Sequence, residues 1–191
     1  SIKTFGGQDS DDSLYVVPDY TGPIDTFRHS WRNVGNFDQF RWLVRRDAQE
    51  QLQMAHEELG IKHLRAVGML DDRMRFYTID PKDFRKKEKE PRLNFQIINY
   101  VIDSLLDIGI NPMFTTCFMP SALASGEGTV FTTKSRISPP NDYDKWVELI
   151  EASVRHVIDR YGRQRVRNWY FEVWNESNLR NGFFEGDQQD F

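Results

Sequence analysis

A recurring order of helix, glycine and strand is the feature that most constrains the fold of this sequence. Apolar residues at helical spacing are followed by glycine at positions 60, 109 and 162, and an apolar, strand-like stretch follows each glycine. Helices that alternate with strands form βα units, and such units build a parallel sheet. The repeat of about fifty residues also predicts long loops after the strands.

The pattern predicts four strands, three helices and a tail that begins a fourth helix. The expected strands are residues 27–36, 61–67, 110–118 and 166–175. The expected helices carry apolar faces over residues 44–59, 95–108 and 146–161, with Asn94 as the cap of the second. Residues 37–42 are expected to be a connection, residues 13–17 a short separate strand, and residues 179–191 the start of the fourth helix.

Four βα units are about half of an eight-stranded (β/α)8 barrel, which typically needs about 250 residues. The sequence therefore predicts an α/β fold of the TIM-barrel type in which residues 27–191 form about the first four βα units, after a lead-in segment at 1–26. An open doubly wound sheet is the alternative. It would be expected to carry a glycine-rich phosphate loop after a strand, but Gly126-Glu127-Gly128 lies in a loop that lacks this context.

The predicted last strand runs into polar residues at Asn175-Glu176, and this break is the strongest candidate for an active site. Reactive groups of βα sheets collect at the carboxyl ends of the strands. An apolar neighbour such as Trp174 can raise the pKa of a carboxyl group, which then donates a proton near neutral pH. The alternatives are that Glu176 is an ordinary exposed carboxylate and that Asn175 only caps the strand.

Composition and charge exclude several classes of function. A net charge of −4 gives no reason to expect a nucleic-acid partner, and no run of about 18 apolar residues predicts a membrane span. The single cysteine, Cys117, predicts no internal disulfide. The four histidines have no ligand spacing, so no metal site is expected. No signal peptide is visible, and the localisation stays open.

Four longer phrases resemble glycoside hydrolase family 39, nearest its β-xylosidases. They are residues 47–66 (DAQEQLQMAHEELGIKHLRA), 118–131 (FMPSALASGEGTVF), 138–146 (SPPNDYDKW) and 161–179 (YGRQRVRNWYFEVWNESNL). The resemblance runs from about residue 31 to the end and implies a (β/α)8 barrel with retaining glycosidase activity on β-xylosidic or related bonds, without a cofactor. It implies that Glu176 is the general acid/base, that Asn175 binds the sugar 2-hydroxyl, and that the nucleophilic Glu lies outside this chain.

The resemblance and the strand ends suggest further substrate-binding residues. Arg65, at the end of the second predicted strand, could hold a carboxylate of the site or form a structural ion pair. Phe118 resembles the family's sugar-facing aromatic residue, with plain core packing as the alternative, and Trp174 would line the pocket. Glu172 is expected to be structural and paired with an arginine, while Asp71-Asp72 are expected to cap or pair within their loop.

Several positions depart from the family pattern. Val67 stands where the family usually has a substrate-contacting histidine, and Ser177 replaces the proline of Asn-Glu-Pro. Thr115 or Thr116 replaces a common Glu of the third strand, and Phe183-Phe184 stand near the place of a tryptophan. These changes bear on which sugar is cleaved, and they are also compatible with lost activity.

A carbohydrate substrate is the expected partner. A half-barrel would leave two sheet edges and helix surface uncovered, which predicts a missing C-terminal half, a second chain or self-association. The alternative function is a non-catalytic carbohydrate-binding or sensory half-barrel derived from such an enzyme. Turnover of a xyloside distinguishes the two.

Overall fold

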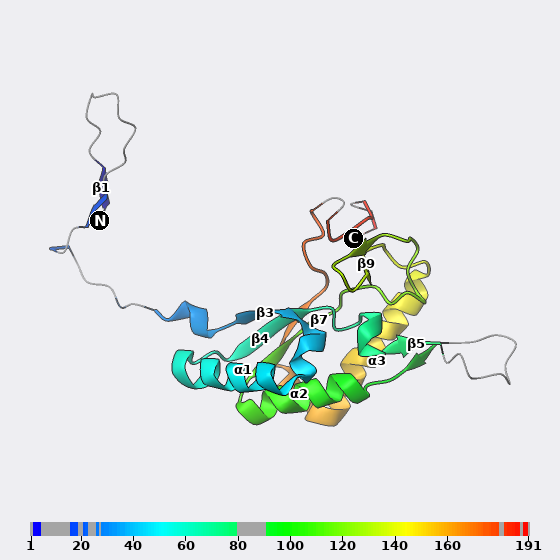
Figure 1. Cartoon of the computed structure of the whole chain (residues 1–191), viewed down its shortest axis with the longest axis horizontal. Coiled ribbons are helices and arrows are strands. Elements are labelled where there is room, and N and C mark those ends of the chain that lie inside the picture. Colours follow the sequence, from blue (N-terminus) through cyan, green and yellow to red (C-terminus); the bar gives the residue numbers. More distant parts are fainter. Residues whose placement is uncertain are drawn as a thin grey trace, which may run out of the picture. The chain divides into compact units, whose positions relative to one another are not determined.

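The computed structural model describes residues 2–4, 16–18, 21–22, 26, 28–79, 91–179, 182–187 and 189–190, which fall into two compact units (Figure 1). The first unit, Ser1–Ser30, contains strands β1 (Ile2–Thr4) and β2 (Val16–Pro18), which pair in antiparallel fashion. The short strand predicted at residues 13–17 thus has its counterpart in β2, and residues 13–15 lie outside the described part of the chain.

The second unit, Trp31–Phe191, is built on a parallel sheet of four strands. Its strands are β3 (Gly35–Gln39), β4 (His63–Val67), β7 (Asn111–Thr115) and β10 (Tyr170–Glu172). They lie side by side in the order β10-β7-β4-β3, so every strand pairs with its neighbour along the chain. The predicted α/β class and the four parallel strands are confirmed.

Three long helices connect these strands, as the repeat predicts. They are α1 (Arg46–Leu59), α2 (Gln96–Ile108) and α3 (Tyr143–Tyr161), and Figure 1 shows α1 and α2 along the sheet. Gly60 and Gly109 end α1 and α2 in the left-handed conformation. A Cβ atom on Gly109, whose φ is 96°, would lie 3.1 Å from the ring of His56, so this helix end needs glycine for both backbone and space.

Side chains begin the second and third helices. The Asn94 side chain accepts a hydrogen bond from the Gln96 amide at 3.0 Å, and Asp142 accepts one from the Lys145 amide at 3.1 Å. Asn94 thus satisfies the amide of the first residue of α2, but the capping position itself is Phe95, one residue later than predicted. Between the helices and the sheet, α2 contributes the most deeply buried face. Its buried residues are Ile98, Val101, Ile102 and Leu105.

Strand boundaries differ from the predictions at both ends of the sheet. The first strand is residues 35–39 rather than 27–36, and the segments around it form the 3-10 helices η1 (Ser30–Arg32) and η2 (Phe40–Val44). The physical reason is burial: Trp31 and Val34 are 46% and 37% exposed, whereas Phe40 and Leu43 fill the core. The predicted connection at 37–42 therefore contains the end of β3 and most of η2.

The last strand is shorter than predicted, because the short helix α4 (Arg163–Val166) and a turn come before it. Val166 and Trp169 read as the start of a strand, but they enter the core from the helix and the turn, where they are 5% exposed each. The two middle strands are also shorter than predicted. β4 begins at residue 63 rather than 61, and β7 covers residues 111–115 rather than 110–118. In the described parts of the tail, residues 182–187 and 189–190, turns and bends replace the expected fourth helix.

The longest loops follow β4 and β7, at the carboxyl edge of the sheet. The loop after β4 contains η3 (Asp72–Met74) and the hairpin strands β5 (Tyr77–Thr78) and β6 (Arg92–Leu93). The loop after β7 contains the hairpin of β8 (Thr129–Val130) and β9 (Ser135–Arg136). None of the helices in the described part of the chain is long and apolar enough to cross a membrane.

Candidate active site

An ion pair between Arg65 and Glu172 joins β4 to β10 at the candidate site. The guanidinium Nη2 lies 2.7 Å from Glu172 Oε1, and Nε lies 2.9 Å from Oε2. Both side chains are about one-fifth exposed, at 22% and 19%. This two-point contact confirms the structural pairing expected for Glu172, and it is the geometry in which an arginine binds a carboxylate most specifically.

The same guanidinium also holds Asn175. Arg65 Nη2 donates to Asn175 Oδ1 at 2.6 Å, and Nη1 donates to Asn36 Oδ1 at 3.0 Å. Asn175 is 6% exposed, although it lies beyond the end of β10. Arg65 therefore links β3, β4, β10 and the segment after β10, and it fixes the oxygen of the Asn175 amide. The amide nitrogen of Asn175 donates to none of the described residues.

Glu176, the predicted acid/base, follows in a left-handed backbone conformation with φ of 48°. Its side chain is exposed and forms no hydrogen bond or ion pair with the described residues, while its carbonyl accepts the Leu179 amide at 2.9 Å. The last strand, predicted to run to residue 175, ends at Glu172, so Glu176 lies in the loop after β10. A non-glycine residue with positive φ is uncommon, and such strained residues cluster at functional sites.

An aromatic cluster occupies the carboxyl ends of β7 and β10. Phe118 is fully buried, and its ring centroid lies 5.8 Å from Phe131, 5.9 Å from Trp174 and 6.2 Å from Phe183. Trp174 is 8% exposed, and its indole nitrogen donates to the carbonyl of Phe183 at 2.8 Å. Phe131 is 38% exposed and presents the cluster's apolar surface to solvent. Sequence reasoning missed Phe131, whose loop position gave no signal beyond its place in the phrase at 118–131.

Three of the positions that depart from the family pattern, Val67, Thr115 and Thr116, offer no free hydrogen-bond donor. Val67 is buried at the end of β4. The Thr115 hydroxyl donates to the Ala66 carbonyl at 2.7 Å, and the Thr116 hydroxyl donates to the Val173 carbonyl at 2.5 Å. These threonines connect neighbouring strands, and their hydroxyl groups already donate to backbone carbonyls.

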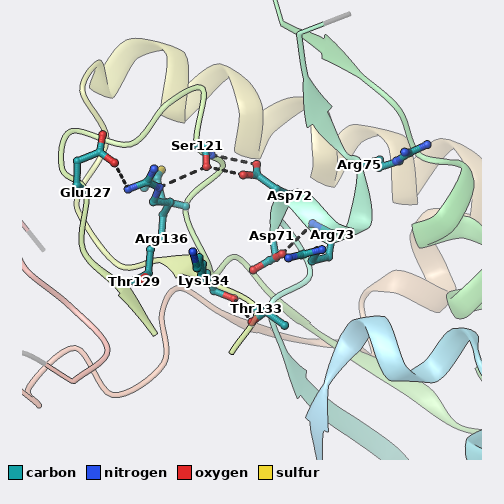
Figure 2. Close-up of a pocket in the computed structure, with 12 residues that line it drawn as sticks. Asp71, Asp72, Arg73, Arg75, Ser121, Glu127, Thr129, Thr133, Lys134 and Arg136 are labelled. Atoms are coloured by element: carbon teal, nitrogen blue, oxygen red, sulfur yellow. Dashed lines mark hydrogen bonds and ion pairs between the residues drawn. The ribbon is translucent and has the colours of Figure 1, made fainter. Parts of the chain in front are cut away.

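A polar cavity of about 810 Å³ lies beside these strand ends, between the loops after β4 and β7 (Figure 2). Asp72 accepts the Ser121 amide at 3.0 Å and also the Ser121 hydroxyl, which connects the two loops. Asp71 accepts the Arg73 amide at 2.8 Å. The loop pairing predicted for Asp71 is thus confirmed, whereas the partner of Asp72 comes from the other loop. The sequence contained no motif for this cavity, because its lining residues are dispersed.

The histidines and the cysteine have structural surroundings. Nδ1 of His56 lies 2.7 Å from the Ile61 carbonyl, and the two ring nitrogens of His63 each lie 2.9 Å from a backbone carbonyl. Burial raises the pKa of the Cys117 thiol to about 11, so this thiol stays protonated near neutral pH. Among the described residues, no group of three or more His, Cys, Asp or Glu could hold a metal ion.

Comparisons with known proteins agree with this architecture. A beta-xylosidase of Caldicellulosiruptor saccharolyticus is 42% identical over 148 residues, covering 78% of this chain and 29% of that relative. A beta-xylosidase of Geobacillus stearothermophilus is 36% identical over 167 residues, covering 87% and 32%. The chain therefore spans less than a third of the length of these curated relatives.

A solved structure and a family model give the same result. The crystal structure of a monomeric beta-xylosidase from Caulobacter crescentus CB15 superposes with a TM-score of 0.76 at 32% identity, covering 83% of this chain and 31% of that one. The model of glycosyl hydrolases family 39 matches residues 18–191. The chain thus belongs to glycosyl hydrolases family 39, where it resembles the β-xylosidases and forms about the first four βα units of the family's (β/α)8 barrel.

Proposed function

We propose that this chain is part of a retaining glycoside hydrolase that cleaves β-xylosidic bonds, with Glu176 as its general acid/base. The observation that carries the proposal is the link from Arg65 to Asn175, which holds the residue next to Glu176 at the carboxyl edge of the sheet. Active sites of (β/α)8 enzymes lie at this edge. The relatives named beta-xylosidases support the substrate class.

The mechanism needs two carboxyl groups about 5–5.5 Å apart. Glu176 first protonates the glycosidic oxygen as the leaving group departs, while a carboxylate from outside this chain attacks the anomeric carbon and forms a covalent glycosyl-enzyme. Glu176, now ionised, then takes a proton from water, whose oxygen displaces the enzyme carboxylate. Its exposure in this chain leaves the carboxyl group open to substrate and water.

Asn175 and Arg65 have supporting roles in this proposal. Arg65 occupies one acceptor position of the Asn175 oxygen at 2.6 Å, which orients the amide nitrogen as a donor to a sugar hydroxyl. Arg65 already binds Glu172, so its charge is partly neutralised before substrate arrives. Phe118 and Trp174 support the apolar wall of the cluster, and Phe131 supplies the exposed ring on which the apolar face of a sugar can pack.

The test is hydrolysis of an aryl β-xyloside by the complete gene product and its Glu176→Gln variant. General acid/base catalysis accelerates a reaction by about 10²–10⁴-fold, so we expect kcat of the variant to decrease by a factor in that range. Azide needs no general base, so adding it should restore turnover and yield a xylosyl azide. Glu151→Gln, which changes an exposed glutamate of α3, is the matched control and should keep wild-type activity. Unchanged turnover by Glu176→Gln would contradict the assignment.

The non-catalytic carbohydrate-binding module remains the second candidate because of one observation. The side chain of Val67 offers no hydrogen bond, and the hydroxyls of Thr115 and Thr116 are engaged with backbone carbonyls, so these three residues at the ends of β4 and β7 contribute no free side-chain donor to a sugar. Binding of xylo-oligosaccharides without turnover by the complete gene product would favour this candidate over the enzyme.

A further inference from the structure

The cavity beside the strand ends has the size and lining of a ligand site. Its volume of about 810 Å³ falls within the range of small-molecule pockets, about 300–1,000 Å³, and is far larger than an inorganic ion needs. Among its lining residues, Met119 is the one apolar side chain, and charged and hydroxyl groups make up the rest. Such a lining favours a polar ligand with several hydrogen-bonding groups.

Positive charge in the cavity is only partly neutralised. Arg73, Arg75 and Lys134 are exposed and make no ion pair with the described residues. Arg136 pairs with Glu127 at 2.6 Å, but the side chain of Glu127 is 93% exposed and sits at the solvent side of that pair. Arg73 comes from η3 in the loop after β4, and Lys134 comes from the turn between β8 and β9. These two cations can therefore meet an anionic ligand from both of the loops that border the cavity (Figure 2).

The backbone that presents these cations is held in place before any ligand binds. Asp71 accepts the amide of Arg73, and Asp72 ties the same loop to Ser121. Lys134 has φ of 57°, in the left-handed region that non-glycine residues rarely adopt. Its amide donates to the Phe131 carbonyl at 3.1 Å, which closes the turn of the β8–β9 hairpin. The hydrogen bond fixes the position of Lys134 at the end of this turn.

The cavity adjoins the proposed sugar site. Met119 lines the cavity, and its chain neighbour Phe118 belongs to the aromatic cluster with Trp174. The β8–β9 hairpin takes part in both, because Phe131 packs against Phe118 while Lys134 lines the cavity. The cavity and Glu176 thus lie at the same edge of the sheet, where one extended saccharide could reach both.

We propose that this cavity binds the carboxylate of an acidic sugar residue carried by the saccharide substrate. The Arg73 guanidinium matches a planar carboxylate, and Lys134 adds a second positive charge. The carboxylate of Asp72 can accept from sugar hydroxyls, and the lining hydroxyls can accept from or donate to them, which a bare anion would not need. The inference rests on the proposed function, because it gives the substrate of that site an acidic branch or terminus.

The test compares binding of two xylo-oligosaccharides with the same backbone, one carrying a glucuronate residue and one neutral, to the complete gene product by calorimetry. The glucuronate form should bind about tenfold more tightly at low salt, as expected for charge-assisted hydrogen bonds at a partly exposed site. Added salt should reduce this preference. Arg73→Gln combined with Lys134→Gln should abolish it, while hydrolysis of a neutral aryl xyloside stays at the wild-type rate.

The matched control is Lys62→Gln combined with Arg167→Gln. These residues are also an exposed lysine and an exposed arginine, but they precede β4 and β10 at the opposite edge of the sheet, so the control should keep the preference. Equal binding of the two saccharides, or a preference that survives in the Arg73/Lys134 variant, would overturn the inference. Sulfate that competes as strongly as the glucuronate saccharide would overturn it in favour of a plain anion site. If the wild-type gene product did not hydrolyse the aryl xyloside, that result would instead count against the proposed function.

Discussion

Arg65 carries the most interactions of any side chain at the candidate site. It binds side-chain oxygens of Asn36, Glu172 and Asn175 through three different nitrogens. A lysine has a single ammonium group on a flexible stem and could not reach these acceptors in one fixed geometry. The residue before the proposed acid/base is therefore positioned by an arginine from a strand more than a hundred residues earlier in the chain.

Removing Arg65 should destabilise the fold, because it leaves the carboxylate of Glu172 unpaired. Breaking a buried ion pair from one side costs about 3–5 kcal/mol, and the partial exposure of this pair puts the expected loss for Arg65→Met near the lower end. Urea unfolding measures this loss as a change in the free energy of unfolding.

The double variant Arg65→Met/Glu172→Gln serves as the control for that experiment. It removes both charges, so it should recover part of the stability lost in Arg65→Met alone. If the loss of unfolding free energy in the double variant equalled the sum of the losses in Arg65→Met and Glu172→Gln, the direct coupling between Arg65 and Glu172 would be refuted.

The interface between α2 and α3 contains a histidine whose charge state matters for stability. The ring of His156 on α3 stacks on Phe95 just before α2, with centroids 3.6 Å apart, and Nε2 lies 2.8 Å from the side-chain oxygen of Asn99. Burial, followed by the nearby charge of Arg160, lowers the pKa of His156 below its ordinary value of 6.5. The folded protein therefore favours the neutral ring.

This shift predicts a loss of stability in mild acid. The unfolded chain takes up the His156 proton first as the pH falls below about 6.5, so this contribution to the free energy of unfolding is complete above that pH. The contribution of His156 decreases as the pH falls below about 6.5, and it levels off below the lowered pKa of His156 in the folded state. Urea unfolding between pH 5 and 8 should show a smaller decrease in His156→Gln than in wild type. Helical circular dichroism checks that the variant folds, and an identical decrease in both proteins would contradict the prediction.

At the scale of the whole molecule, apolar side chains are exposed on β10 and directly after its end. Phe171 and Val173 are 45% and 63% exposed, and β10 pairs with β7 as its only partner among the described strands. Exposed apolar residues on an unpaired strand edge favour association with another sheet or another chain. This surface supports the expectation that residues 1–191 need a further half-barrel, from the same chain or from a second copy.

We expect a protein made of residues 1–191 alone to self-associate through this surface. Sedimentation velocity should show a mass that rises with concentration, and Val173→Lys should shift the distribution toward the monomer because a charge on the edge opposes pairing. Met54→Lys is the control, because Met54 is similarly exposed at 58% but lies on α1. A monomer at all concentrations, or equal effects of the two substitutions, would contradict the assignment of the surface.

Much of the fold could be predicted because its signals are local. The helical spacing of apolar residues and the glycines after residues 59 and 108 predicted α1 and α2 almost to the residue. The end strands were predicted less well. Trp31 and Trp169 have the composition of strand residues, but Trp31 is 46% exposed outside the sheet and Trp169 enters the core from a turn, so the surrounding structure decides which such residues join the sheet.

The candidate site also has a part that could be predicted from the sequence and a part that could not. Asn175 and Glu176 could be selected from the sequence, because they follow an apolar run at a strand end and match a family phrase. The hydrogen bonds from Arg65 to Asn175 and from Ser121 to Asp72 could not be predicted from the sequence, because they join residues 110 and 49 positions apart. Local pattern determines which elements form and where the reactive residues stand in the chain. Only the packing of those elements decides which distant side chains meet, since such contacts depend on strand order and loop path.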